Sequence, residues 1–234
     1  MSLFLRERDT SLKEFMDDPN CDPELLEATY SQFESVNKLL GGWNRIYKTY
    51  IRQPLINAGE NASLLDIGCG GGDILRLIDS FCRRDNLNVR FKGIEPDSRA
   101  ISYINKQEWP DHFSFSEAYS GDLVRQEKSF TIVISNHLMH HLTPEELKQL
   151  CGDAENLASR RVIFSDIERS DIGYAGFRTF APLLFKNSFI VKDGVRSIRR
   201  SYQKDELQPV LPDGWSVERQ FPFRLLAICD GGNA

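Results

Sequence analysis

The sequence predicts an α/β fold: a doubly wound, Rossmann-like, mostly parallel sheet of seven strands, with an N-terminal helical cap and a lid insert after the fifth strand. The first observation is that short apolar segments alternate with amphipathic ones from Ser63 onward. Alternating strands and helices form right-handed βαβ units, with helices on both faces of a parallel sheet. The second is a glycine-rich stretch directly after the first apolar segment, as in many nucleotide-binding folds. A chain of 234 residues accommodates one such domain and a cap.

The individual elements follow from hydrophobic periodicity. Short apolar runs predict strands at Ser63–Ile67, Val89–Ile94, Phe130–Ser135, Arg161–Phe164, Trp215–Arg219 and Leu225–Cys229. Amphipathic runs with the helical period predict helices at Ile74–Phe81, Ser98–Asn105, Pro144–Leu157 and Lys204–Leu211. The last two strands are close together in the chain, so we expect an antiparallel hairpin at one edge of the sheet.

Two segments lie outside this alternation. Residues 1–58 are predicted to form the N-terminal helical cap, because apolar side chains recur there at three- and four-residue steps on both sides of Gly41-Gly42. Residues 59–234 are then the main domain. Within it, residues 170–200 are too many for a simple connection, so we expect a lid insert there, with a hairpin turn at Asp193-Gly194.

The composition of the chain indicates its cellular compartment and argues against some classes of binding partner. A net charge of −5 argues against an extended nucleic-acid surface, which depends on Lys and Arg contacts to phosphates. The apolar runs are too short to cross a bilayer, and residues 6–9 are charged where a secretory signal would be apolar. Five scattered cysteines, an odd number, predict a reducing compartment and no zinc site. We therefore expect a cytoplasmic protein without membrane insertion, and a homodimer stays open.

The most informative segment is Leu64–Asp73. A buried strand ends there in a glycine-rich turn, and a helix starts near Asp73. Glycines allow positive φ and let the backbone approach a ligand without obstruction by a Cβ. We therefore expect this loop to bind a cofactor, through Asp66, Gly68, Cys69, Gly70, Gly72 and Asp73.

Further acidic residues follow at the expected places. Glu95 ends the second predicted strand, roughly twenty residues beyond the glycines, where an acid can accept both hydrogen bonds of a ribose diol. Pro96 and Asp97 come directly after it. Asp122 and Leu123 precede the next predicted strand, in the neighbourhood of an adenine edge.

With these residues, the chain resembles the class I S-adenosylmethionine-dependent methyltransferases, small-molecule branch, over about residues 60–170. The resemblance implies that S-adenosyl-L-methionine is the cofactor and that Asp66 orients its methionine end. It further implies that Glu95 holds the ribose hydroxyls, that Pro96 and Asp97 flank the adenine, and that Asp122 meets the adenine amino group. The lid segments are similar to those of bacterial enzymes of secondary-metabolite or quinone-type pathways.

A nicotinamide cofactor is the rival interpretation of the loop. Its fingerprint spaces the glycines as G-x-G-x-x-G, whereas Gly68, Gly70 and Gly72 give G-x-G-x-G. The carboxylate of Asp66 would also repel a pyrophosphate, while it would attract a cationic amino group. Both points favour S-adenosyl-L-methionine, a sulfonium compound, over a nicotinamide cofactor.

Three of the four histidines lie in Asn136–Leu142, after the strand at Phe130–Ser135. Ligands of open α/β sheets bind outside the carboxyl ends of the strands. We therefore expect cofactor contacts from Asn136 and His137, and a general base for a hydroxyl acceptor at His140, with His141 second.

The resemblance supports the choice of His140, since several small-molecule O-methyltransferases place a catalytic histidine after this strand. The alternative is that these histidines pack under the cofactor and bond to backbone carbonyls. No carboxylate pair near them in the sequence completes a coordination set, so no metal is predicted.

The predicted function is methyl transfer to a small, aromatic or hydrophobic acceptor at a hydroxyl group. The aromatic-rich insert favours a planar or apolar acceptor. The segment after Ser135 lacks the Asn/Asp-Pro-Pro-Tyr signature of enzymes that methylate adenine or glutamine nitrogens. N- or C-methylation of a small molecule is one alternative, and a non-catalytic cofactor-binding protein of the same fold is another.

Overall fold

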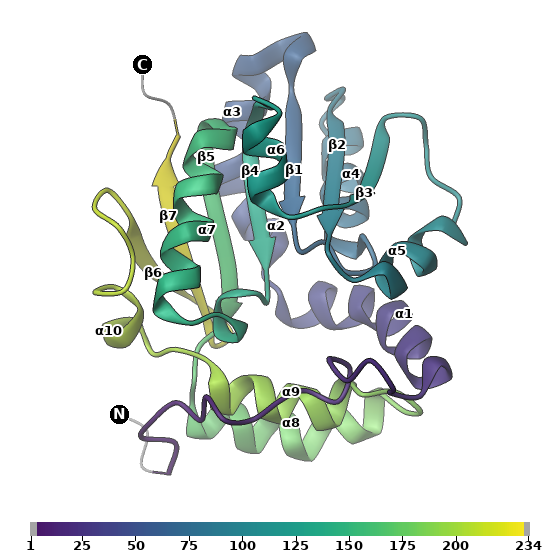
Figure 1. Ribbon diagram of the computed structural model, residues 1–234, viewed down its shortest axis with the longest axis vertical. Coiled ribbons are helices and arrows are strands. Elements are labelled where there is room, and N and C mark those ends of the chain that lie inside the picture. The colour runs from purple at the N-terminus through teal and green to yellow at the C-terminus, as the bar shows by residue number, and fades with distance from the viewer. Residues whose placement is uncertain (1–3, 232–234) are drawn as a thin grey trace.

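The computed structural model describes residues 4–231 and confirms the predicted fold class (Figure 1). One seven-stranded sheet has the order β3-β2-β1-β4-β5-β7-β6. Strand β7 is antiparallel to both of its neighbours, and the other adjacent pairs are parallel. The chain reverses direction across the sheet between β1 and β4, where such folds open a crevice at the carboxyl ends of the strands. The strands are β1 Ser63–Ile67, β2 Arg90–Glu95, β3 Phe113–Glu117, β4 Phe130–Asn136, β5 Ala158–Ile167, β6 Ser216–Gln220 and β7 Arg224–Asp230.

Helices cover both faces of the sheet, as predicted. Buried apolar side chains form one large cluster on each face. The longer helices are α1 Pro23–Leu40, α4 Asp73–Arg84, α5 Ser98–Asn105, α7 Pro144–Leu157, α8 Asp171–Leu184 and α9 Ile190–Arg200. The shorter ones are α2 Trp43–Ile46, η1 Tyr47–Ile51, α3 Arg52–Ala58, η2 Gly59–Asn61, α6 Ser120–Arg125, η3 Met139–His141 and α10 Lys204–Leu207.

Two details of the elements differ from the sequence prediction. Strand β3 was not predicted as a strand. It is an edge strand whose residues are half-buried or exposed, so serines alternate with Phe113 and Phe115 and no continuous apolar run marks it. Helix α10 ends at Leu207 rather than Leu211: Gln208 still has helical backbone angles, but Pro209, the next residue, has no N–H to continue the helical hydrogen bonds.

The N-terminal cap is smaller than residues 1–58. Helices α2, η1 and α3 pack on the sheet, with Trp43, Ile46 and Leu55 buried in the same cluster as strand residues of β1 and β4. The change occurs at Gly42, whose φ of 66° turns the chain between α1 and α2. Among residues 4–58, only α1 and the segment before it therefore lie outside the layers packed on the sheet. In Figure 1, α1 lies beside α8 and α9 at the lower end of the molecule.

The predicted insert at 170–200 consists of two packed helices, α8 and α9. The hairpin turn predicted at Asp193-Gly194 is wrong, because both residues lie inside α9. Asp193 is in the first turn, where a carboxylate is favourable to the helix dipole. A Cβ on Gly194 would lie 2.3 Å from Cε1 of Phe177 in α8. The glycine therefore permits close packing of the two helices and does not mark a turn.

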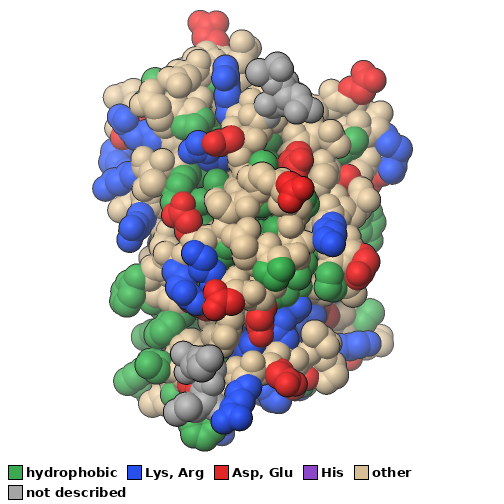
Figure 2. Space-filling view, turned by 90° about the vertical axis from the view of Figure 1, so that its left-hand side faces the viewer, with side chains coloured by type: hydrophobic (Ala, Val, Ile, Leu, Met, Phe, Trp, Pro, Cys, Tyr) green, Lys and Arg blue, Asp and Glu red, His purple; other side chains and the backbone are tan. Residues whose placement is uncertain are grey.

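Several apolar side chains of this helical layer face outward. Ile172, Phe180, Leu183 and Leu184 of α8 are all exposed. Figure 2 shows hydrophobic side chains at the surface toward the bottom of the molecule, the end where Figure 1 places α8 and α9. Within residues 4–231, no helix combines the length and the apolar character needed to span a bilayer. The five cysteines are free thiols.

Candidate active site

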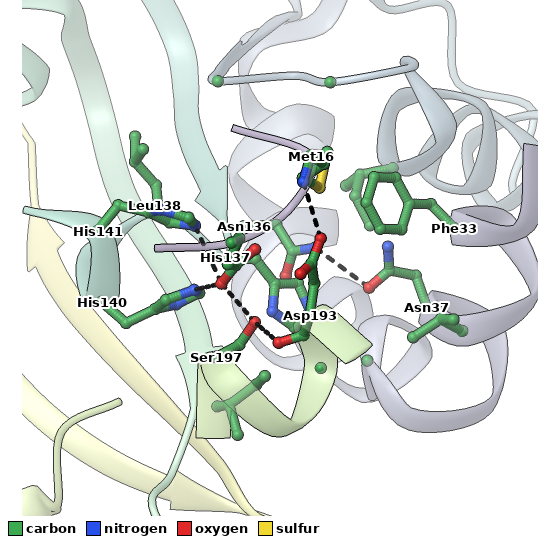
Figure 3. Close-up of a pocket in the computed structure, with 18 of the residues that line it drawn as sticks. Met16, Phe33, Asn37, Asn136, His137, Leu138, His140, His141, Asp193 and Ser197 are labelled. Atoms are coloured by element: carbon green, nitrogen blue, oxygen red, sulfur yellow. Dashed lines mark hydrogen bonds and ion pairs between the residues drawn. The ribbon is translucent and has the colours of Figure 1, made fainter. Parts of the chain in front are cut away.

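A cavity of about 1100 Å³ lies at the carboxyl ends of the strands. Its walls come from the loop after β1, the end of β2, the segment after β4, and helices α1, α8 and α9. Figure 3 shows part of it, with Phe33 and Asn37 of α1 opposite His140 and Ser197. The cavity therefore brings together the predicted cofactor loop, the histidine segment and the insert.

The glycine loop has the backbone that its sequence predicted. Gly68, Gly70 and Gly72 have φ values of 71°, 50° and 78°, which L-residues with a Cβ rarely adopt. The N–H groups of Gly68 and Cys69 donate to the carbonyl of Ile94, which ties the loop to β2. Gly68, Cys69 and Gly70 line the cavity. Gly72 does not line it; a Cβ there would lie 2.7 Å from Trp109, so its role is to let the loop pack.

Two carboxylates lie next to the loop, the buried Asp66 and the half-buried Asp73, and both line the cavity. Oδ1 of Asp66 is buried and has no hydrogen-bond partner among residues 4–231. Burial, and then the charges of Asp73 and Glu95, raise the pKa of Asp66 well above its usual range. Burial also raises the pKa of Asp73 to about 6, although Asn37 donates to its carboxylate at 2.8 Å. An unpaired buried carboxylate fits a ligand that carries a cationic amino group.

Glu95 is held in place by the glycine loop. Its Oε2 accepts the N–H of Gly70 at 3.0 Å, and its Oε1 accepts the N–H of Asp97 at 3.1 Å. Burial raises the pKa of Glu95. Glu95, Pro96 and Asp97 all line the cavity, and their contacts with ribose and adenine stay a prediction. The carboxylate of Asp97 is paired with Arg99 at 2.7 Å, so it also fixes the start of α5.

Asp122 and Leu123 do not lie where the sequence analysis placed them. Both are in helix α6, and neither lines the cavity. Asp122 accepts the backbone N–H of Tyr119 at 2.8 Å and pairs with Arg125, while Leu123 is buried in the apolar core. The prediction that these two residues contact the adenine is therefore not supported. Tyr119, Ser120 and Gly121, just before them, line the cavity instead.

Asn136 and His137 leave β4 and are fixed by a buried arginine. The Arg224 guanidinium donates to Oδ1 of Asn136 at 2.6 Å, and its Nη1 lies 2.8 Å from Nε2 of His137. Burial and then the charge of Arg224 lower the pKa of His137 well below its usual range. His137 has a φ of 59°, so the chain turns sharply there. Asn136 also donates to Asn37 of α1, which connects the cofactor side to the cap.

His140, the predicted base, is held between two carboxylates. Its Nδ1 lies 2.8 Å from Asp166 and its Nε2 lies 3.2 Å from Glu14, and its side chain is 1% exposed. Burial opposes the charged form, but Asp166 and Glu14 outweigh it and raise the pKa of His140 to about 9. Both ring nitrogens are therefore occupied, and this geometry disfavours His140 as a free base for an acceptor.

His141 is in a different state although it is adjacent in the chain. Its side chain is 25% exposed, with Nε2 3.7 Å from Glu14 and Nδ1 3.6 Å from Asp17. Burial and the charge on His140 lower the pKa of His141 to about 4. His141 is therefore neutral at physiological pH and is the more available of the two histidines.

The sequence analysis missed the acidic partners of these histidines. Glu14 is 126 residues away from His140, in a segment without helical or strand periodicity. The segment is held on α9: Asp193 accepts the N–H groups of Phe15 and Met16 at 2.7 and 3.0 Å, and Ser197 donates to Glu14 at 2.6 Å. Such pairing over a long sequence separation leaves no local signal.

Two other missed residues did have a signal. Asp166 lies near the carboxyl end of β5, beside that of β4, so strand order alone points to it. Arg224 begins β7, and because β7 is antiparallel its first residue lies at the same edge. Both could have been found from the sequence by assigning every polar residue at that edge of the sheet.

Comparisons with known proteins bear on the fold and on residues 64–168 of the chain. Residues 64–168 match a family model described as a methyltransferase domain. This part of the chain is therefore similar to a methyltransferase domain. A search of curated proteins found no match. Among solved structures, the plantazolicin methyltransferase BpumL in complex with SAH is similar, with 14% identity, 93% of each chain covered and a TM-score of 0.58.

Two more solved structures have the same fold. One is BpumL in complex with a triazolic desmethylPZN analog and SAH, with 16% identity, 87% of this chain and 86% of that chain covered, and a TM-score of 0.53. The other is described as the conversion of a disulfide bond into a thioacetal group during echinomycin biosynthesis, with 16% identity, 79% and 82% covered, and a TM-score of 0.52. These identities show a shared fold.

Proposed function

We propose that this protein transfers a methyl group from S-adenosyl-L-methionine to a small apolar molecule, at a hydroxyl group. The observation that carries the proposal is the continuity of the cavity. One end has the glycine loop, Asp66 and Glu95, and the other has apolar residues of α1, α8 and α9 beside the histidines. Donor and acceptor would therefore meet inside one continuous cavity, and such alignment supplies much of the rate enhancement.

The donor end fits the cofactor residue by residue. Asp66 and Asp73 would receive the cationic amino group, and the carboxylate of Glu95 would accept hydrogen bonds from the ribose diol. Pro96 and Tyr119 to Gly121 would lie along the adenine. Asn136 and His137 would contact the cofactor from the β4 side. BpumL, which has the same fold, was crystallised with SAH, and this supports the assignment.

The acceptor end is apolar. Most of the side chains there are aromatic or aliphatic: Phe33, Val36, Phe177, Phe180, Ile198 and Phe223. A cavity of about 1100 Å³ exceeds the usual upper range of about 1000 Å³ for single-ligand pockets, so it has room for a cofactor and an acceptor together. A small hydrophobic or aromatic acceptor is the class that such a wall favours.

A hydroxyl acceptor must lose its proton when it attacks the methyl group. His141 is better placed than His140 to take that proton, because His140 uses both ring nitrogens on Asp166 and Glu14. N- or C-methylation stays the alternative within enzymes. A cofactor-binding protein without catalysis is the alternative outside them. A cytoplasmic location remains a prediction from the sequence.

Transfer of a labelled methyl group tests the proposal. The purified chain is incubated with tritiated S-adenosylmethionine and with organic and aqueous fractions of a cell extract. Label is expected in the organic fraction, in a product that alkali-stable ether analysis identifies as an O-methyl group. Glu95→Gln should abolish the transfer at low cofactor concentration, and Glu117→Gln, an exposed glutamate on the neighbouring strand, should retain it. Label confined to the aqueous fraction, or none, would contradict the proposal.

A further inference from the structure

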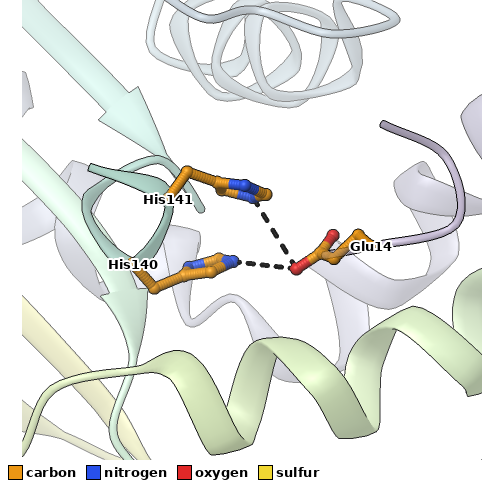
Figure 4. Close-up of side chains that lie close together, drawn as sticks. All are labelled: Glu14, His140 and His141. Carbon is orange, nitrogen blue, oxygen red and sulfur yellow. Dashed lines mark hydrogen bonds and ion pairs between the residues drawn. The ribbon is translucent and has the colours of Figure 1, made fainter. Parts of the chain in front are cut away.

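Three ligand atoms converge at the acceptor end of the cavity. Within the described chain, Glu14, His140 and His141 each offer one atom, and the three atoms lie within 4.8 Å of one another (Figure 4). Glu14 comes from the N-terminal segment, and the histidines come from η3. From this geometry we propose a binding site for one divalent transition-metal ion, of the zinc or iron(II) class, with a two-histidine, one-carboxylate ligand set.

The spacing of these atoms is that of ligands around one ion. Zinc binds imidazole nitrogen and carboxylate oxygen at about 2.0–2.2 Å, which places tetrahedral ligand atoms about 3.3–3.6 Å apart. Oε1 of Glu14 lies 3.2 Å from Nε2 of His140 and 3.7 Å from Nε2 of His141. Two imidazoles and one carboxylate also form the triad that holds zinc or non-haem iron with further positions open.

The outer partners of both histidines strengthen the argument. A metal-bound histidine nearly always donates its other ring N–H to a carboxylate, a carbonyl or water. Nδ1 of His140 lies 2.8 Å from Asp166, and Nδ1 of His141 lies 3.6 Å from Asp17. Both rings thus direct Nε2 toward Glu14 and Nδ1 toward a second acid. Ser197 orients Glu14 by donating to it at 2.6 Å.

The local charge favours a cation. Glu14, Asp166 and Asp17 each lie within 3.7 Å of a ring nitrogen of the two histidines. Three arginines lie near the cluster: Arg8, which donates to the carbonyl of His140, Arg200, 3.9 Å from Asp17, and Arg224, which bonds to Asn136, His137 and Ser165. A bound metal would replace the proton on His140 and hold Nε2 as a ligand.

The site is open to the acceptor. Glu14, Asp17, His140 and His141 all line the cavity. If the acceptor hydroxyl enters an open position on the ion, the positive charge lowers the pKa of that hydroxyl. This role, unlike the metal site itself, rests on the proposed function. It also changes the part played by His141, from proton acceptor to ligand.

Metal titration of the full chain, without an affinity tag of histidines and after removal of metals with EDTA, tests the site. Zn²⁺ binding is followed by calorimetry, and Co²⁺ binding by its visible absorption. We expect one ion per chain, with affinity reduced at least about tenfold in Glu14→Gln and in His141→Ala, since even outer partners contribute about 10–100-fold. His112→Asn is the control, because this fourth histidine pairs with Asp79 away from the cavity.

Three results would overturn the metal site. Absence of saturable binding at one equivalent overturns the site, and so does binding that Glu14→Gln and His141→Ala leave unchanged while circular dichroism shows them folded. Equal weakening in His112→Asn also overturns it. A parallel titration with S-adenosylhomocysteine in EDTA reports the cofactor pocket alone. Its failure would remove the proposed function and leave the metal site standing, and the reverse holds as well.

Discussion

Cofactor binding should depend on pH through Asp73. Burial raises the pKa of Asp73 from 3.8 to about 6. The ammonium group of the cofactor, placed beside this carboxylate, favours its charged form and lowers its pKa in the complex. Binding therefore requires Asp73 to lose a proton at any pH below about 6.

The magnitude follows from the linkage between proton and ligand. Well below pH 6 the dissociation constant should rise about tenfold for each pH unit. Because Asp73 is half protonated at pH 6, the dissociation constant should be about fivefold higher at pH 5 than at pH 6, or about 1 kcal/mol. Above about pH 7 this contribution is constant. The sign is fixed because a carboxyl pKa that is higher in the free protein than in the complex makes binding release protons.

Isothermal titration with S-adenosylhomocysteine at pH 5, 6 and 7.5, in two buffers of different ionisation heat, measures both the affinity and the proton release. Asp73→Asn should bind more weakly at pH 7.5 and lose the step near pH 6. Burial also raises the pKa of Asp66, and the contribution of Asp66 remains in the variant. An affinity that does not change between pH 5 and 6, or an identical step in Asp73→Asn, would refute the reasoning.

Three other predictions test separate parts of the molecule. Glu95→Gln should weaken S-adenosylhomocysteine binding by about 10–100-fold, because one or two charge-assisted hydrogen bonds are lost. Asp122→Asn should bind normally, because Asp122 is outside the cavity. Titration calorimetry measures both affinities. His141→Ala should reduce turnover by about 100-fold or more at unchanged cofactor affinity, and an unchanged rate would exclude a part for His141 in proton removal. Gly194→Ala should destabilise the fold by about 1–3 kcal/mol in urea unfolding, since its Cβ would meet the Phe177 ring at 2.3 Å. If that contact is the cause, adding Phe177→Ala to the Gly194→Ala variant should reverse part of the loss.

Local patterns in the sequence predicted most of the sheet and the donor half of the site. Strands β1, β4 and β5 are buried and apolar, so their composition alone marks them. The glycine loop and Glu95 follow from strand ends and the geometry of a cofactor, both of which are local. Edge strand β3 was missed because half its residues face solvent, and this error also misplaced Asp122.

The acceptor half depends on contacts between distant segments. Glu14 lies beside His140 and His141 because α9 packs against η3 and Asp193 of α9 holds the N-terminal segment. Periodicity carries no information on such a contact, and neither does residue spacing. For the same reason the availability of His140 as a base could not be judged from the sequence, since its two acidic partners come from other elements.

The most direct test of the central claim is a titration of the wild-type chain with S-adenosylhomocysteine at pH 7.5. The arrangement of the glycine loop, Asp66 and Glu95 predicts saturable binding of one molecule per chain. A folded chain that takes up neither this product nor S-adenosylmethionine would contradict the account, whatever its resemblance in fold.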